Sequence, residues 1–384
     1  MKKVKVGIIG IGNMGSAHCK LILEGKVPDI EIVAVADRRE ERREWIKENL
    51  PESVQVFNEG TDLIDSGICE AIMIEVPHYQ HPELAQRAFA KKQHVLCEKP
   101  AGVYTKQVRE MNEAAAKSDV AFAMMFNQRT NSVYRKMHEI IKSGELGEIM
   151  RVNWIITDWF RTQMYYDSGD WRGTWDGEGG GVLLNQCPHQ LDLLQWICGM
   201  PAQIQAFCNE GKWHEIEVED DVTAYLTYPN GATGVFITST GDTPGTNRFE
   251  VSLEKGKLIC ESDKLILYRL EESAREFCKT AKEGFSTPKY VIEEIETDGE
   301  NQQHVGVMNN FTKNILEGTS LIAGGEEGIN GLMLSNAMHL SSWLKKPVSL
   351  PVDEDLFLEK LNERRATSVK KVGKNVTFAT EGSY

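Results

Sequence analysis

The sequence lacks the features of a nucleic-acid-binding or membrane-spanning protein. Basic residues are in deficit, since 43 Lys and Arg oppose 57 Asp and Glu and leave a formal net charge of −14. A nucleic acid or an anionic membrane surface requires a basic face, so neither partner is expected. No apolar run is long enough to span a bilayer. The opening MKKVKVGIIG does not have the apolar core and cleavage site of a signal peptide, so we expect a cytoplasmic protein.

Paired cysteine motifs are also missing. The eight cysteines are scattered along the chain without a Cys-x-x-Cys pair. A chain of 384 residues can bury a core without covalent cross-links, so we expect buried, reduced thiols. The same spacing argues against a structural zinc site, and we predict no metal.

The apolar pattern divides the chain into three parts. Residues 1–126 alternate short apolar runs with helical stretches, which predicts parallel βαβ units in a sheet covered on both faces. Residues 127–351 contain longer strands of alternating character, which favour an antiparallel sheet with helices on one face. Within them, YPNGAT predicts a hairpin with a two-residue Asn-Gly turn. Residues 352–384 form a charged helix and a polar tail.

A glycine-rich motif lies between the first predicted strand and helix. GIIGIGNMGSAH places Gly10, Gly12 and Gly15 in the G-x-G-x-x-G spacing of a dinucleotide site. In that context the glycines allow a tight turn, close approach of the pyrophosphate and close helix packing. The alternative is that they only form a turn. Asp37 ends the second strand and suits the ribose hydroxyls of NAD, whereas the adjacent Arg38 could accept NADP, so NAD is favoured and NADP remains possible.

Two further segments carry candidate catalytic residues. HVLCEKP places Glu98 and Lys99 at the end of a predicted parallel strand, where ligands bind in doubly wound sheets. The alternative is a surface lysine paired with Glu98. GGGVLLNQCPHQLDLLQW, residues 179–196, predicts a short strand and then a helix that begins at Pro188. His189 then lies in the first turn, where the helix dipole favours a neutral imidazole that can act as a base.

Other roles for His189 remain open from the residues alone. It could be a core histidine bonded to a backbone carbonyl. A metal site with Cys187 and Asp192 would need more ligands than the segment offers. The acidic stretch VEDD, which ends at Asp221, is expected to be a solvated turn.

The ordered set of motifs resembles the glucose–fructose oxidoreductase / inositol dehydrogenase (Gfo/Idh/MocA) family. The motifs are GIIGIGNMG, VPHYQHPELAQRA, VLCEKPAG, SGELGEI, YDSGDWRG, GGGVLLNQCPHQLDLLQW and SSWLKKPVSLP. The resemblance covers residues 3–351. It implies an α/β fold with an N-terminal Rossmann domain and a C-terminal α+β domain whose open, mostly antiparallel sheet often builds dimers or tetramers.

The resemblance also implies roles for single residues. Lys99 is expected beside the reacting hydroxyl, and His189 is expected to be the base. At Asn185 the sequence departs from the family, because many relatives carry Asp four residues before the histidine. We expect Asn185 to orient a substrate hydroxyl. From motifs and resemblance together, the expected cofactor-binding residues are Gly10, Gly12, Asn13, Met14, Gly15, Asp37, Arg38, Pro77, His78, His81, Glu98, Lys99, Asn127, Trp171 and Arg172.

An aromatic segment is the candidate substrate-binding region. NWIITDWFRTQMYYDSGDWRGTW carries four of the eight Trp residues among Arg and Tyr side chains. Aromatic faces stack on sugar rings, but they could equally fill a core or an oligomer interface. The expected substrate-binding residues are Lys99, Trp159, Arg161, Tyr165, Tyr166, Asn185 and His189. The loop STGDTPGTNRFE is a second candidate.

Together these features predict an NAD-dependent oxidoreductase. It would transfer a hydride between a ring secondary hydroxyl of a sugar, glycoside or cyclitol and nicotinamide, and it would form a homo-oligomer. One alternative is a redox glycosidase that holds NAD tightly and cleaves glycosides by oxidation and elimination. Another is a non-catalytic NAD-sensing protein, although a sensor would not need both Lys99 and His189.

Overall fold

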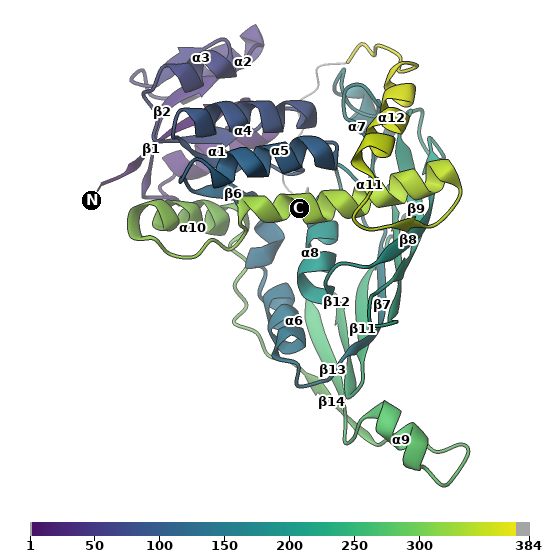
Figure 1. Cartoon of the computed structure of the whole chain (residues 1–384). Helices are drawn as coiled ribbons and strands as arrows, with labels where there is room; N and C mark the ends of the chain where they lie inside the picture. The colour runs from purple at the N-terminus through teal and green to yellow at the C-terminus, as the bar shows by residue number, and fades with distance from the viewer. Residues whose placement is uncertain (1, 374–384) are drawn as a thin grey trace.

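Two β-sheets organise residues 2–373, the part of the chain that the computed structural model describes (Figure 1). In this part, six strands form a sheet of order β3-β2-β1-β4-β5-β6, and every neighbouring pair is parallel. They are β1 (Val4–Ile9), β2 (Ile30–Ala36), β3 (Gln55–Phe57), β4 (Ala71–Ile74), β5 (His94–Cys97) and β6 (Phe122–Met124). The predicted Rossmann sheet is confirmed. Its strand order reverses between β1 and β4, where such sheets bind ligands.

Helices cover both faces of this sheet, because its strands alternate apolar side chains between two buried clusters. The helices preceding β6 are α1 (Asn13–Leu23), α2 (Glu40–Asn49), α3 (Gly60–Asp65), α4 (His81–Ala90) and α5 (Thr105–Ala116), with the short η1 (His78–Gln80). One further helix, α10 (Gln303–Glu317), also packs here, and its Phe311 shares a buried cluster with Val6 of β1. The division after residue 126 stays a prediction, but α10 belongs to the first sheet by its packing.

The second sheet is mixed but mostly antiparallel, as predicted. In the described region its nine strands have the order β14-β13-β12-β11-β7-β10-β9-β8-β15, and only β7 and β10 pair in parallel. They are β7 (Ile149–Ile156), β8 (Gln203–Glu210), β9 (Glu219–Thr227), β10 (Thr233–Ser239), β11 (Asn247–Leu253), β12 (Gly256–Glu261), β13 (Lys264–Leu270), β14 (Tyr290–Glu294) and β15 (Val348–Ser349).

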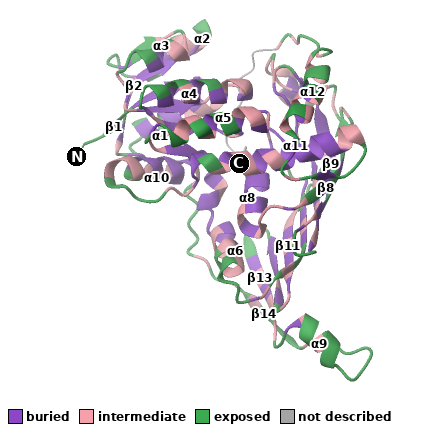
Figure 2. Ribbon diagram, viewed as in Figure 1, coloured by how far each residue is buried: buried purple, intermediate pink, exposed green. Residues whose placement is uncertain are grey.

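Helices cover one face of the second sheet. α6 (Ser132–Ser143), α8 (Pro188–Cys198) and α11 (Gly328–Leu344) lie on this side (Figure 1). The remaining helices are η2 (Asn127–Thr130), α7 (Gln163–Asp167), α9 (Ala274–Thr280), η3 (Gly325–Glu327) and α12 (Glu354–Arg365). None of the residues of α9 is buried (Figure 2). Across the described chain, no helix combines the length and hydropathy that crossing a membrane requires.

The β9–β10 hairpin is confirmed, but its turn differs from the prediction. Tyr228 N–H donates to the Ala232 carbonyl at 2.9 Å, which leaves a three-residue loop rather than two. Pro229 fixes a φ suited to the start of a type I turn, and Gly231 has a φ of +85°. The proline therefore favours the longer loop over the Asn-Gly turn.

Two local predictions around Glu219 are wrong. Glu219 is fully buried at the start of β9, so VEDD is not a solvated turn. Its carboxylate accepts the N–H groups of Gly181 at 2.9 Å and Leu183 at 3.0 Å. Residues 181–187 therefore form turns around a buried carboxylate instead of the predicted strand.

The expectation of buried thiols also fails for Cys278, which is exposed.

Candidate active site

The glycine-rich loop forms an open cradle between β1 and α1. Gly10 has a φ of +94°, and a Cβ there would lie 2.5 Å from the Glu75 carbonyl oxygen. A Cβ on Gly15 would lie 2.0 Å from the Gly10 oxygen. Gly12 differs, because its nearest heavy atom to such a Cβ is 3.8 Å away. Packing within the protein requires glycine at positions 10 and 15, whereas Gly12 leaves the space that a pyrophosphate needs.

The start of α1 suits phosphate binding. Asn13, Met14 and Gly15 occupy its first turn, and no side chain caps the helix. The backbone amide groups of a helix start and the positive end of the helix dipole favour an anion at this position. The residues present therefore fit the NAD that the glycine motif predicts.

Asp37 lies at the edge of this cradle. It is 8% exposed, and its carboxylate accepts the N–H of Ile11 at 2.8 Å and of Arg39 at 2.9 Å. Arg38 is engaged elsewhere, because its Nε donates to Glu59 at 2.7 Å. The carboxylate of Asp37, rather than the Arg38 guanidinium, is thus fixed beside the glycine loop, and the Arg39 guanidinium lies there with it, with its Nε 3.4 Å from Asp37.

The loop after β4 carries the next predicted cofactor residues. Pro77 precedes η1, and Nδ1 of His78 contacts the Glu178 carbonyl at 3.0 Å. The two ring nitrogens of His81 contact the carbonyls of Val76 and Pro100, each at 2.7 Å. His81 therefore ties two loops together, and its ring nitrogens serve the fold.

Lys99 and His189 come together although 90 positions separate them in the sequence. Lys99 follows β5, and its Nζ donates to the Asn185 carbonyl at 2.9 Å. Burial lowers the pKa of Lys99, while Glu98 acts in the opposite direction. His189 is the second residue of α8 and is 7% exposed. Burial, followed by the charge of Lys99, holds the pKa of His189 well below 6.5, so its imidazole is neutral.

The Nδ1 atom of His189 has no hydrogen-bond partner among residues 2–373. A histidine that served only the core would use this nitrogen on a carbonyl, because an unpaired buried polar atom is costly. An unpaired nitrogen on a neutral imidazole beside a lysine is instead suited to exchange a proton with a bound ligand.

Sequence reasoning missed a buried carboxylate beside this pair. Glu178 is 1% exposed, accepts a short hydrogen bond from Asn185 Nδ2, and also accepts Gly173 N–H at 2.6 Å. Arg172 Nη1 lies 4.0 Å from the same carboxylate. Asn185 thus faces Glu178. A glutamate among glycines, in GEGGG, was the signal that could have indicated a buried charge.

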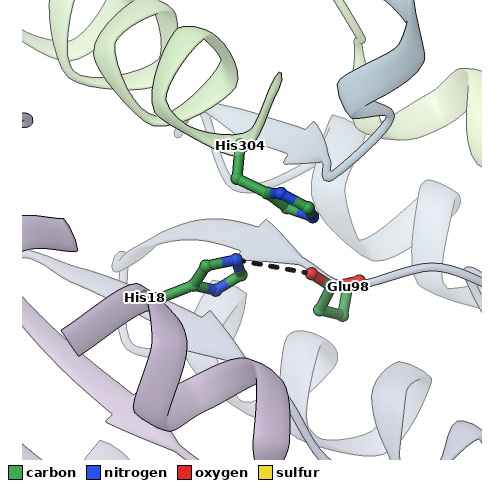
Figure 3. A group of neighbouring side chains, drawn as sticks. All are labelled: His18, Glu98 and His304. Carbon is green, nitrogen blue, oxygen red and sulfur yellow. Dashed lines mark ion pairs between the residues drawn. The ribbon is translucent and has the colours of Figure 1, made fainter. Parts of the chain in front are cut away.

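Four titratable side chains form a second buried group under the ends of β1, β4 and β5. His18 Nδ1 lies 2.9 Å from Glu75, and its Nε2 lies 3.9 Å from Glu98. Figure 3 shows His304 of α10 facing the same point. Burial lowers the pKa of His18, but attraction to Glu75 and Glu98 outweighs it and leaves the pKa raised. Burial, followed by Glu75, raises the pKa of Glu98 to about 7.

This group resembles a metal site in composition. The ligand atoms of His18, Glu98 and His304 lie within 4.8 Å of one another. The carboxylates of Glu75 and Glu98 favour the cationic form of His18, and a metal ion would have to displace that proton. We therefore interpret the group as a buried ion cluster that holds Glu98 next to Lys99.

The candidate substrate residues divide into two sets. Trp159 and Arg161 line a polar cavity of about 630 Å³, together with Gln190, the neighbour of His189. Tyr165 is outside this lining, and its hydroxyl accepts from Arg172 at 2.7 Å and from Gln186 at 3.0 Å.

Three other predicted residues have different surroundings. Tyr166 is 1% exposed and bonds Thr240 at 2.9 Å. Trp171 packs edge-on against His78, with ring centroids 5.5 Å apart. Asn127 is fully buried and donates to Gln303 at 2.6 Å.

Comparison with known proteins agrees with both sheets. Residues 4–126 match a family model described as an oxidoreductase family with an NAD-binding Rossmann fold. Residues 134–259 match a model described as the GFO/IDH/MocA C-terminal domain.

Individual relatives are distant. Myo-inositol 2-dehydrogenase of Thermotoga maritima is 24% identical over 353 residues, which is 90% of this chain and 98% of the relative. Glucose-6-phosphate 3-dehydrogenase of Bacillus subtilis is 30% identical over 148 residues, 38% of this chain and 41% of the relative. The WlbA dehydrogenase of Bordetella pertussis, solved with NADH and UDP-GlcNAcA, has a TM-score of 0.76 at 23% identity, covering 92% of this chain and all of that one (100%). At this identity the structural likeness shows the fold alone.

Proposed function

This chain belongs to the Gfo/Idh/MocA family of NAD-binding oxidoreductases, and from that premise we propose that it oxidises a ring secondary hydroxyl of a sugar, glycoside or cyclitol. One observation carries the proposal. Lys99, half-buried at the carboxyl end of the sheet that bears the glycine cradle, lies near a neutral, buried His189, and Gln190, the residue after His189, lines a polar cavity.

The residues divide the chemistry between them. The glycine cradle and Asp37 would hold NAD, which would supply the hydride acceptor for the reacting carbon. Lys99 donates a hydrogen bond to the hydroxyl oxygen and stabilises the negative charge that develops there. The imidazole of His189 accepts the hydroxyl proton on a ring nitrogen, and in the reverse direction it returns that proton. Glu178 and Asn185 hold Lys99 in position through the Asn185 carbonyl.

A panel of sugars, glycosides and inositols tests the proposal. The protein is mixed with NAD+ and each compound, and NADH formation is followed by absorbance. At least one polyol should give steady NADH production. If no compound does so, the dehydrogenase proposal fails. Glycoside cleavage without NADH accumulation would instead indicate the redox glycosidase.

We expect a preference for NAD over NADP. The fixed carboxylate of Asp37 would repel the 2′-phosphate of NADP, because like charges in contact cost several kcal/mol. With one active substrate, kcat/KM should be higher with NAD+ by ~10-fold or more. Asp37→Ser should narrow this difference, whereas Glu52→Gln at an exposed site should not. A preference for NADP would reject the assignment and implicate Arg38.

We also expect a dimer or tetramer. The face of the second sheet opposite α8 exposes Phe207 at 64%, Tyr225 at 48% and Ile155 at 37%. The strand registers place all three side chains on one side, and exposed apolar patches of this kind mark interfaces. Light scattering at micromolar concentration should give an oligomer that Phe207→Glu with Tyr225→Glu weakens. A wild-type monomer would contradict this expectation.

A further inference from the structure

The polar cavity beside His189 has a lining that points to the kind of ligand it takes. It is formed by segments far apart in sequence, around η2, the end of β7, the start of α8, and the loops that precede β11, β13 and α10. Trp159 is 8% and Gln190 4% exposed, so both side chains are more than nine-tenths buried. Trp159 Nε1 and Gln190 Oε1 have no hydrogen-bond partner within the described chain. One unpaired donor and one unpaired acceptor match a ligand rich in hydroxyl groups, since a hydroxyl both donates and accepts.

The charged side chains of the lining are mostly acidic. Asp158, Glu261 and Asp263 contribute carboxylates, and Arg161 is the single cation among the lining residues. The Arg161 guanidinium lies over the Trp159 ring, 5.5 Å from its centroid, and its Nη1 donates to the Phe160 carbonyl. Arg248, outside the lining, pairs with Glu261 at 2.6 Å. Asp158 and Asp263 therefore leave the cavity with an excess of negative charge.

The start of the helix nearest this charge does not compensate for it. Helix α6 begins at the cavity wall, and a free helix N-terminus would attract a phosphate. Its first amides are already used, because Ser132 N–H donates to the Glu300 carbonyl at 2.9 Å and Val133 N–H donates to the Asn131 side chain at 2.9 Å. Helix α8 begins with Pro188, which has no N–H, so its first turn offers one amide donor fewer than that of α1. The first amides of α6 are therefore not donors for a phosphate, and α8 offers only the amides that follow Pro188.

We propose that the substrate is a polyhydroxylated ring without a phosphate group, either uncharged or carrying a basic amine. The inference rests on the proposed function and narrows its substrate class. A phosphate dianion would enter a cavity with an excess of carboxylates, and like charges placed together cost several kcal/mol. A protonated ring amine could pair with Asp158 or Asp263 instead. The volume of about 630 Å³ leaves room for a glycoside as well as a single ring.

Matched rings test the charge preference directly. The NAD+-loaded protein is assayed with D-glucose, D-glucosamine and glucose 6-phosphate, and with myo-inositol and a myo-inositol phosphate. For the ring that is oxidised, we expect kcat/KM of the unphosphorylated form to exceed that of the phosphate ester by ~10-fold or more. The amine should be at least as good as the neutral ring. A phosphate ester that matches or exceeds its parent overturns the inference and leaves the hydride-transfer proposal intact.

Charge variants separate electrostatics from shape. Asp158→Asn combined with Asp263→Asn should reduce the discrimination against the phosphate ester by ~10-fold. Glu48→Gln combined with Glu52→Gln, an equal change of charge at two exposed sites away from the cavity, should leave the ratio unchanged. An unchanged ratio in the double variant would also overturn the inference.

Failure of hydride transfer is distinguishable from failure of the charge preference. If no ring is oxidised, the proposed function fails, and calorimetry on the NADH-loaded protein measures the charge preference. Binding of glucose 6-phosphate or myo-inositol phosphate that is as tight as or tighter than that of the parent ring contradicts the inference. Weaker or absent binding of the esters supports it.

Discussion

His189→Ala is expected to lower kcat by ~100-fold or more, because general base catalysis contributes at least that factor. NAD affinity should be unchanged, since the glycine cradle lies on β1 and α1 while His189 lies on α8. Steady-state kinetics, cofactor titration and thermal melting of the variant measure the three quantities. A stable, NAD-binding variant with near-normal kcat would remove His189 from the mechanism.

The pH dependence gives an independent test of the same residue. Burial and Lys99 hold the pKa of His189 well below 6.5, and the base is active only when unprotonated. Protonation of His189 should therefore reduce kcat/KM only at a pH below 6.5, not near neutrality. Asn185→Asp places a second carboxyl group against Glu178, and the negative charge that this pair gains favours the imidazolium, so the acidic limb should move to higher pH. Asn185→Ala should cost less activity than His189→Ala because the base remains.

Lys99→Met is expected to lower kcat/KM by ~100-fold or more, because it removes the ammonium that stabilises charge on the hydroxyl oxygen. Its side chain has nearly the same length, so the main change is the loss of the charge and of the bond to the Asn185 carbonyl. The variant should still bind NAD through the glycine cradle. Kinetics with a single active substrate and cofactor titration measure both effects.

Lys99→Arg is the matched control for this change. It retains the positive charge but cannot reproduce the geometry of the ammonium, so activity should fall between wild type and Lys99→Met.

The charge of Lys99 also lowers the pKa of Glu98, which is raised to about 7 overall. In Lys99→Met that pKa should rise further, and a carboxyl-sensitive infrared titration can follow it. Near-normal turnover by Lys99→Met would exclude Lys99 from the chemistry.

Much of the ligand-binding framework could be predicted because its signals are local. The spacing of Gly10, Gly12 and Gly15 between a strand and a helix reflects backbone requirements within a few residues. Continuous apolar strands imply a sheet covered on both faces, and alternating strands imply an antiparallel one. Pro188 indicated a helix start, which placed His189 in its first turn. Lys99 was found as a polar residue at a strand end.

The surroundings of these residues were decided by tertiary contacts. Glu178 faces Asn185, and Glu219 is buried under the turns that precede α8, although both are charged side chains in glycine-rich or acidic stretches. A carboxylate is buried only where amide donors or cations meet it. The amide partners of Glu219 come from a segment 36 to 38 positions away, and those of Glu178 meet it only because residues 172–185 fold back on themselves. Phe311 likewise joins the core of the first sheet only because the tertiary fold packs α10 against that sheet.

By itself, the sequence determined the parallel nucleotide-binding sheet, the mostly antiparallel second sheet and the identity of the lysine and the histidine. Periodicity and glycine spacing encode these features within single elements, where neighbouring residues fix the backbone. Only the tertiary structure decided that Lys99 lies near His189, that Asn185 pairs with Glu178, and that Asp158 and Asp263 share one cavity. These contacts join residues that are between seven and about a hundred positions apart, and a periodic pattern carries no information about which side chains will meet.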